Sequence, residues 1–345
     1  MEGHFSEKDE PCVRRAFQEA IRSSLSYQGK FAEENINMAR IAIVGAGAMG
    51  SVYAGLMASA GHEVHAVTLW KEHAQAMSRC GLRLEGISGD RTAPVRGSTT
   101  TKGIGSCDLV IISTKAADVE TAARSALSLL GPETSVQTIQ NGLGSADRVA
   151  SIIDPDRIAV GVVGGFGASL RAPGHVHHNG MEMVRFGAYA GLPRTALEAG
   201  AQIWRSAGFK VALFDDTDRM VWEKLIFNVA FSATSCLTGK TVGEVLSDPN
   251  TWWVAQHCAL EAVEVADALG VRLHVGDPLE YIRRLGAKIP DARPSMLLDH
   301  LSRQPSEIEV INGAIPREAE KVGLTAPVNA TLVALVKARE AEWSR

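Results

Sequence analysis

The apolar residues of the first half of the chain fall in short β-branched runs that alternate with segments of helical spacing. The first run, Arg40–Val44, predicts a buried strand, and residues 51–60 predict a helix that ends at Gly61. Further strands are predicted at residues 63–69, 108–113, 135–139 and 210–214, helices at 118–130 and 193–207, and a glycine-rich β-like stretch at 157–186. Alternating strands and helices predict an α/β domain.

Helical periodicity replaces this pattern after residue 215, for example in residues 255–269 and 326–343. We therefore predict an α/β domain over residues 38–215 and an all-helical domain over residues 216–345. A cleft between two such domains is the expected place for a ligand.

The sequence predicts two helices around Pro305. One begins near Pro294 and must end before Pro305. Residues 306–309 have the form of a capping box, which predicts the start of the other helix. Glu307 would lie in its first turn, where a carboxylate also complements the helix dipole. The buried stripe of this helix would be Ile308, Ile311, Ile315, Ala319 and Val322.

Residues 1–37 differ from the rest because they are rich in charge and begin without a recognisable core element. Met38 directly precedes the first predicted strand. We expect residues 1–37 to be an extension outside the fold, with translation starting at Met38.

The sequence GAGAMG joins the first strand to the first helix, which is the context in which a GxGxxG motif binds a dinucleotide. The first glycine permits a tight turn, the second lets the backbone approach a pyrophosphate, and the third lets helix and strand pack closely. The helix N-terminus offers unpaired N–H groups to the phosphates. The alternative is a glycine-rich turn of another α/β protein. The predicted cofactor-binding residues here are Gly45, Ala46, Gly47, Ala48, Met49 and Gly50.

The residues after the second strand bear on which dinucleotide is bound. A carboxylate there would bind the ribose hydroxyls of NAD, whereas a basic residue would receive the phosphate of NADP. The chain has Trp70 at this point, and Lys71 and Glu72 offer both signs of charge one residue later. The residues alone leave NAD and NADP open.

Lys115 and Asn141 each follow a predicted strand of the α/β domain. Ligands of open α/β sheets bind beyond the carboxyl ends of the strands, so both residues are candidates for ligand contacts. The alternatives are a solvated loop lysine and, for Asn141-Gly142, a simple turn pair.

Lys224, Asn228 and Ser232 are spaced four apart in the otherwise apolar residues 220–235. Positions four apart share a helix face, so these residues form one polar row on a helix that is apolar elsewhere. Such a helix is normally buried, and a buried lysine needs an anionic or hydrogen-bonding partner. The alternative is a lysine whose ammonium group reaches water at the edge of the helix.

Composition excludes several classes of function. The chain has 345 residues, of which 46% are hydrophobic, enough for two domains with cores. A net charge of −4 without a basic block argues against nucleic acid or an anionic membrane surface as a partner. No apolar run approaches the length of a membrane span. Five scattered cysteines without a CxxC pair indicate reduced thiols and a cytoplasmic location.

His175, His177 and His178 suggest a metal site. Alternation places His175 and His177 on one strand face, but no third ligand completes a site there. We therefore expect a solvated strand edge and no metal.

The chain contains, in this order, GAGAMG, Lys115, Gln140-Asn141-Gly142, WEKLIFN around Lys224, and Ser295-Met-Leu followed by Glu307-Ile and Asn312-Gly313. Taken together, these motifs resemble those of the ketopantoate reductases (2-dehydropantoate 2-reductases), from about Met38 to the end of the chain. The order and spacing of the later motifs are more specific than the glycine motif, which many dehydrogenases share. The resemblance implies a Rossmann-type domain followed by a helical one, NADPH as cofactor, a 2-oxo acid as substrate, and a monomer or homodimer.

The resemblance also implies residue roles. Lys224 would be the general acid, because a protonated lysine stabilises the charge on a ketone oxygen and delivers the proton. Glu307 would lie beside substrate and cofactor and hold Lys224 protonated. The implied substrate-binding residues are Asn141, Asn228, Ser232 and Ser295, and the implied cofactor contacts beyond the glycine motif are Lys115, Asn141, Gly167 and Glu307.

Two positions depart from the family pattern. Ser232 stands where many members have a second asparagine, which leaves the identity of the 2-oxo acid open. Trp70 stands where a basic residue is typical, which leaves the preference for NADP over NAD open. A paralogous reductase of another 2-oxo acid and a non-catalytic NAD(P)-binding sensor are the alternatives. Retention of the acid and its partners argues against the sensor.

Overall fold

The computed structural model describes residues 38–344 apart from residues 166 and 181–182, so the prediction for residues 1–37 falls outside the described residues. The chain packs as two units. Unit 1 contains the residues up to Gln140 and Ala146–Asp215, and unit 2 contains Asn141–Ser145 and Asp216–Arg345. The loop Asn141–Ser145 thus belongs to unit 2, although the chain before and after it belongs to unit 1.

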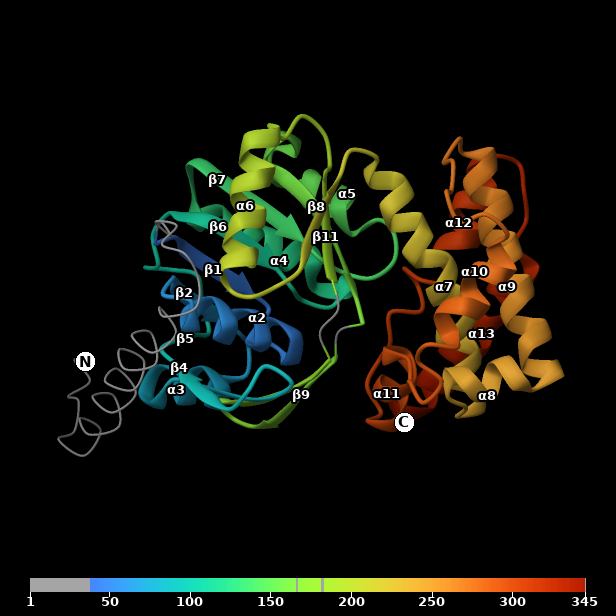
Figure 1. The fold of residues 1–345 in the computed structure, drawn as a ribbon, viewed down its shortest axis with the longest axis horizontal. Helices are drawn as coiled ribbons and strands as arrows, with labels where there is room; N and C mark the ends of the chain where they lie inside the picture. Colours follow the sequence, from blue (N-terminus) through green and yellow to red (C-terminus); the bar gives the residue numbers. More distant parts are fainter. Residues whose placement is uncertain (1–37, 166, 181–182, 345) are drawn as a thin grey trace. The chain divides into compact units, whose positions relative to one another are not determined.

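Among the described residues, unit 1 contains an eight-stranded sheet in the order β12-β11-β8-β7-β6-β1-β2-β5 (Figure 1). Its strands are β1 (Arg40–Val44), β2 (Glu63–Val67), β5 (Arg96–Ser98), β6 (Cys107–Ile112), β7 (Leu130–Thr138), β8 (Ile158–Gly164), β11 (Met183–Ala188) and β12 (Val211–Phe214). The strands from β5 to β8 are parallel, and their order is the Rossmann arrangement. β11 pairs antiparallel with β8, so β11 and β12 run against the others.

The helices α2 (Ala48–Ser59), α4 (Val119–Ala126), α5 (Ser145–Ala150) and α6 (Arg194–Ser206) cover this sheet (Figure 1). Successive residues of a strand point to opposite faces, so β1 feeds two separate cores. Ile41 and Ile43 pack with α2 and α6. Ala42 and Val44 pack with α4 and α5. The predicted α/β architecture with helices on both faces of a largely parallel sheet is therefore confirmed.

Unit 1 also contains a smaller sheet that the sequence pattern did not predict. Its order is β4-β3-β10-β9, so β10 is an inner strand and the expected strand edge at the histidines is wrong. His175 Nε2 and His177 Nδ1 lie 3.1 and 3.3 Å from the carboxylate of Glu85 on β3. The described residues contain no group of three side chains placed to hold a metal ion. The strands are β3 (Leu82–Gly86), β4 (Arg91–Ala93), β9 (Gly167–Ala172) and β10 (His175–Gly180).

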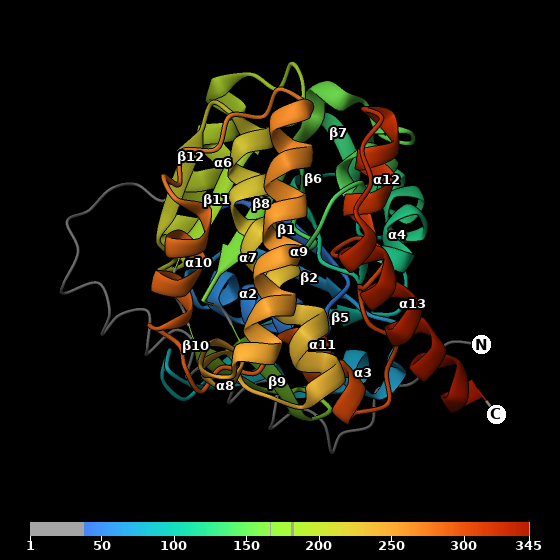
Figure 2. The same ribbon diagram turned by 90° about the vertical axis from the view of Figure 1, so that its right-hand side faces the viewer.

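Unit 2 is helical, and its longest helix is α7. The helices are α7 (Thr217–Thr238), α8 (Val242–Ser247), α9 (Pro249–Ala268), α10 (Pro278–Gly286), α11 (Ser295–Leu301), α12 (Ala314–Lys321) and α13 (Pro327–Ala341). Asp216 is the N-cap of α7, and its side chain accepts a hydrogen bond from the N–H of Arg219. Gly239, in the left-handed region, is the C-cap. α9, α11 and α13 pack against α7 (Figure 2), which explains why α7 is apolar on nearly all sides.

Two further findings concern the helices. No helix in the described part of the chain is long and apolar enough to span a membrane. Of the adjacent tryptophans in α9, Trp252 is buried and stacks under the guanidinium of Arg283, whereas Trp253 is half exposed.

The predicted helix start at Ser306 is wrong. The N–H and the hydroxyl of Ser306 both donate to Glu340 Oε1 of α13, at 2.9 and 2.7 Å. Residues 306–313 form turns, and α12 begins only at Ala314. A capping box does occur elsewhere, between Thr241 and Glu244 at the start of α8. The local signal at Ser306 therefore lost to a tertiary hydrogen bond.

Two buried asparagines link these turns to three helices. Asn312 Nδ2 donates to the carbonyl oxygen of Val229 in α7 (2.9 Å) and to Asn329 Oδ1 in α13 (2.8 Å). Asn329 Nδ2 donates to the carbonyl oxygen of Cys258 in α9 (3.1 Å) and to Glu261 Oε2 (2.8 Å). The Glu261 carboxylate also accepts backbone N–H groups in the first turn of α13. We call Asn312, Asn329 and Glu261 the amide network.

We predict that Asn312→Ala lowers the free energy of unfolding by about 2 kcal/mol, because it leaves buried partners of the amide network unsatisfied. Urea unfolding monitored by circular dichroism measures the change. Asn250→Ala, which removes an exposed asparagine of α9, is the matched control and should change stability little. Equal stability of the two variants would contradict the structural role of Asn312.

Candidate functional site

The glycine turn between β1 and α2 is tight for identifiable reasons. Gly45 has a φ of +104°, and its N–H and that of Ala46 donate to the carbonyl oxygen of Val67 at 2.9 and 2.8 Å. A Cβ on Gly45 would lie 2.5 Å from the backbone nitrogen of Thr114. A Cβ on Gly50 would lie 2.5 Å from the Gly45 carbonyl oxygen. These two glycines are therefore required by the packing of β1, β6 and α2.

Gly47 differs, because the fold does not need its missing side chain. A Cβ there would have no atom within 4 Å, and the backbone is extended rather than left-handed. Gly47 is the N-cap of α2, which has neither a side-chain cap nor an acidic residue in its first turn. Ala48, Met49 and Gly50 form that first turn. A helix N-terminus of this kind fits the phosphates of a dinucleotide, since its N–H groups and its dipole favour an anion.

The turn lies where the strand order of the large sheet reverses, between β1 and β6. The hydroxyl of Ser113 donates to the Gly45 carbonyl oxygen (3.0 Å), and the Gln140 side chain donates to the last carbonyl of β6 (2.8 Å). Thr114 Oγ1 is buried and has no hydrogen-bond partner among the described residues. Lys115 follows and is exposed. The carboxyl ends of β1 and β6 thus present polar groups that a bound ligand can engage.

Trp70 is held in place just beyond β2, at the start of α3 (Lys71–Cys80). Its ring stacks on that of His73, with centroids 5.4 Å apart and planes at 16°. His73 is buried and accepts the N–H of Gly174 at Nδ1 (2.8 Å), so Nε2 carries the proton and donates to Ser51 Oγ (2.9 Å). Burial lowers the pKa of His73 and favours this neutral form. No sequence pattern singled out His73.

Gly167 opens β9, and β9 packs against α2. A Cβ on Gly167 would lie 3.2 Å from the Cβ of Asn179, so this position is also crowded. The glycine is therefore explained in part by packing within the small sheet.

The polar row predicted from sequence lies on one face of α7 in unit 2. Lys224 and Asn228 are half-buried, and Ser232 is 4% exposed. Lys224 Nζ lies 5.7 Å from the ring centroid of Phe227, which is a cation–π distance. The ammonium group therefore lies within cation–π range of one aromatic ring.

Asn141 and Glu307 are brought together although 166 positions separate them. Asn141 Nδ2 donates to Glu307 Oε2 at 3.3 Å. The N–H of Leu143 donates to the carbonyl oxygen of Val310 (2.9 Å). A Cβ on Gly142, which has a φ of +82°, would lie 2.0 Å from that oxygen. The Asn-Gly pair is therefore required for the loop to pack on the turns around Glu307.

Ser295 is the first residue of α11 and is exposed. α11 packs against α7, the helix of the polar row. The predicted residues of unit 2 thus lie on α7, on α11, in the loop at Asn141, and in the turns at Glu307. Asn329 and Glu261 help to position these turns, but neither residue belongs to a local sequence pattern that would reveal this part.

Comparison with known proteins identifies the relatives of this chain. The family models "Ketopantoate reductase PanE/ApbA" and "Ketopantoate reductase PanE/ApbA C terminal" match residues 41–191 and 216–340. The chain belongs to the ketopantoate reductase family. It is therefore an oxidoreductase of a family that uses a nicotinamide cofactor and acts on small 2-oxo acids.

Individual relatives agree with this assignment. The 2-dehydropantoate 2-reductase of Archaeoglobus fulgidus is 30% identical over 301 residues, which cover 87% of this chain and 98% of that protein. The crystal structure of a ketopantoate reductase from Ralstonia eutropha JMP134 has a TM-score of 0.81 at 32% identity and covers 89% of this chain and 100% of that one. D-mandelate dehydrogenase, solved with NADH and anilino(oxo)acetate, has a TM-score of 0.80 at 25% identity, covering 88% and 99%.

The two kinds of glycine in the turn predict different effects of substitution. Gly47→Val should leave the free energy of unfolding within about 0.5 kcal/mol of the parent, because its side chain enters open space. It should weaken dinucleotide binding by about tenfold or more, because it blocks the approach to the helix N-terminus. Gly50→Ala should lower stability by about 1–3 kcal/mol through its clash with Gly45.

Urea unfolding and calorimetric titration with NADPH or NADH measure the two effects on each variant. Gly50→Ala is the comparison variant, in which the expected loss is of folding stability. Unchanged dinucleotide affinity in Gly47→Val would contradict the assignment of the glycine turn as the phosphate site.

Proposed function

We propose that this chain reduces 2-dehydropantoate to pantoate with NADPH, a step of pantothenate biosynthesis in the cytoplasm. The observation that carries the proposal is the row Lys224, Asn228 and Ser232 on α7, in which the half-buried Lys224 lies beside the ring of Phe227. Family membership supplies the reaction class. The Asn141–Glu307 pair adds an amide and a carboxylate from the same unit.

Lys224 provides the proton in this proposal. The cofactor supplies a hydride to the ketone carbon when it is bound. The charge that develops on the ketone oxygen is stabilised by the Lys224 ammonium, which then delivers its proton to that oxygen. Glu307 keeps a negative charge near the site, which favours the protonated lysine.

The remaining residues orient the reactants. Asn228 and Ser295 offer an amide and a hydroxyl, which suit the carboxylate and the hydroxyl of 2-dehydropantoate. Asn141 is fixed by its hydrogen bond to Glu307 and presents its remaining amide groups. The glycine turn of unit 1, with Lys115 beyond β6, holds the dinucleotide phosphates. Gly167 contributes backbone only.

A second candidate is reduction of a different 2-oxo acid. Ser232 is shorter than the asparagine typical of the family, so one substrate hydrogen bond is lost or passes through water. D-mandelate dehydrogenase, a structural relative, is solved with NADH and anilino(oxo)acetate. Trp70, stacked on His73, stands where a basic residue would bind the phosphate of NADP, so NADH is the alternative cofactor.

A panel of substrates tests the proposal. We expect 2-dehydropantoate with NADPH to give the highest kcat/KM, measured by loss of absorbance at the nicotinamide band, among 2-dehydropantoate, 2-oxo-2-phenylacetate and pyruvate with either cofactor. A preference for 2-oxo-2-phenylacetate would replace the proposal with the paralogous reductase. Cofactor binding by calorimetry without oxidation by any substrate would indicate the non-catalytic sensor.

Lys224→Ala should lower kcat by about 10²–10⁴-fold, because it removes the proton donor and the charge at the developing oxyanion. Affinity for the dinucleotide should stay close to that of the parent, since Lys224 belongs to the substrate side of the reaction. Steady-state kinetics and calorimetric titration measure both. Lys288→Ala, which removes an exposed lysine of unit 2, is the matched control. Near-normal turnover in Lys224→Ala would refute the assignment.

A further inference from the structure

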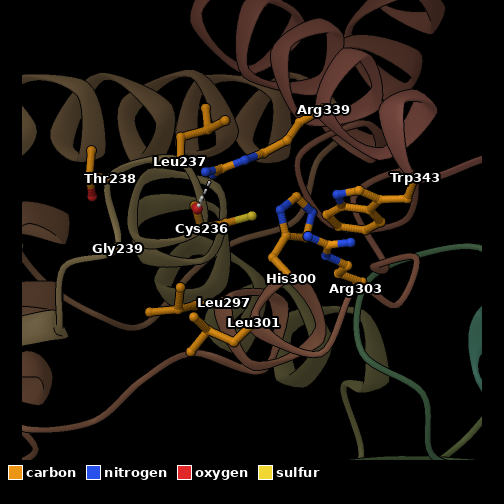
Figure 3. A pocket seen from close by; sticks show the side chains of 10 residues that line it. All are labelled: Cys236, Leu237, Thr238, Gly239, Leu297, His300, Leu301, Arg303, Arg339 and Trp343. Carbon is orange, nitrogen blue, oxygen red and sulfur yellow. Dashed lines mark hydrogen bonds between the residues drawn. The ribbon is translucent and has the colours of Figure 1, made fainter. Parts of the chain in front are cut away.

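Unit 2 contains a cavity of about 390 Å³ that none of the proposed catalytic residues lines. The end of α7, the helix α11 and the C-terminal part of α13 and its extension form its walls (Figure 3). Cys236, which lines it, is twelve residues beyond Lys224 on α7. At the rise of a helix this separates the two residues by about 18 Å along the axis. The cavity is therefore a place apart from Lys224.

His300 is the polar group that marks this cavity as a site. It lines the cavity and is only 8% exposed. Its Nε2 lies 3.1 Å from Glu340 Oε1, so that nitrogen carries a proton. Its Nδ1 is buried and has no hydrogen-bond partner in the described part of the chain. Buried polar atoms are nearly always paired, so the wall of this cavity carries an unusual polar group.

Two arginines, Arg303 and Arg339, add positive charge to the lining of the cavity. Arg339 Nη1 donates to the carbonyl oxygen of Cys236 (3.0 Å), which leaves its other N–H groups for a ligand (Figure 3). Arg303 also lines the cavity. Its φ is +51°, and no other non-glycine residue in the described part of the chain has a positive φ. None of the described residues that line the cavity is acidic. Glu340 and Asp299 act electrostatically on the lining residue Cys236, and the Glu340 carboxylate accepts hydrogen bonds from His300 and Ser306.

Apolar side chains form another part of the lining. Leu297 and Leu301 of α11 contribute aliphatic surface. The indole of Trp343 packs edge-on against the His300 ring, with centroids 4.7 Å apart. A lining that combines apolar and positively charged side chains suits a ligand that has an apolar body and an anionic group. The two arginines make a cation an unsuitable occupant.

We propose that this cavity is a second binding site, for a small carboxylate that carries an apolar or aromatic body. The carboxylate is bound by the guanidinium groups of Arg303 and Arg339. The body packs between the leucines of α11 and Trp343. The site requires no part of the reductase reaction, so it stands independently of the proposed function.

Benzoate is the probe, titrated calorimetrically into the full chain, with neutral benzamide as its isostere. We expect benzoate to bind at least about tenfold more tightly than benzamide. Benzamide has no carboxylate, so it loses at least one charge-assisted hydrogen bond to the arginines. Arg303→Asn should weaken benzoate binding by about tenfold or more, by the same reasoning. Asparagine tolerates a positive φ, so this variant should keep the fold, which its melting temperature checks.

Two further variants separate this site from others. Lys224→Ala should leave benzoate affinity unchanged, whereas its loss there would place benzoate in the proposed substrate site and overturn the inference. Arg284→Asn removes an exposed arginine of α10 and should have no effect. Arg339→Gln provides a second test of the cavity if Arg303→Asn is unstable. Absent benzoate binding, equal binding of benzamide, or full affinity in both cavity variants would each refute the proposal.

Discussion

The amide network is the constraint on which the arrangement of unit 2 depends. Asn312 and Asn329 are both fully buried, and their hydrogen bonds reach α7, α9 and α13. A buried amide without partners is costly, so the turns that carry Asn312 can adopt essentially one register against α7. Glu307 lies five residues before Asn312 in these turns. The position of the carboxylate that pairs with Asn141 is thereby constrained by the buried hydrogen bonds of Asn312 and Asn329.

The fold of unit 1 could be predicted largely because its signals are local. The run Arg40–Val44 matches β1, and the glycine turn and α2 follow as expected. The small sheet could not be predicted, since the alternation of β3 extends over only four residues, Leu82 to Glu85, and β4 has only three residues. β10 pairs with β3, which lies about ninety residues earlier in the chain. The residues around the histidines do not indicate this partner, and therefore predict a strand edge. Nothing local in a sequence indicates such a pairing.

The candidate site likewise has one part that the sequence predicts and one part that it does not. The row on α7 follows from helical spacing alone, and the structure places it on one face of a buried helix. The Asn141–Glu307 pair could not be derived from spacing, because it joins two loops across 166 positions. The capping-box pattern at Ser306 was misleading for the same reason. Glu340 of α13 offers a charged acceptor to both the backbone and the hydroxyl of Ser306, and this outweighs a local cap.

The helix α11 connects two parts of unit 2 that have different chemistry. Its first residue, Ser295, is a proposed substrate ligand, and its sixth, His300, lines the cavity. His300 and Ser295 lie on one continuous helix of seven residues, so a ligand that displaced α11 at His300 would displace Ser295 as well. The two sites are therefore coupled to the extent that a cavity ligand prefers one position of α11 over another. By linkage, a substrate that engages Ser295 must change the affinity of the cavity by the same factor.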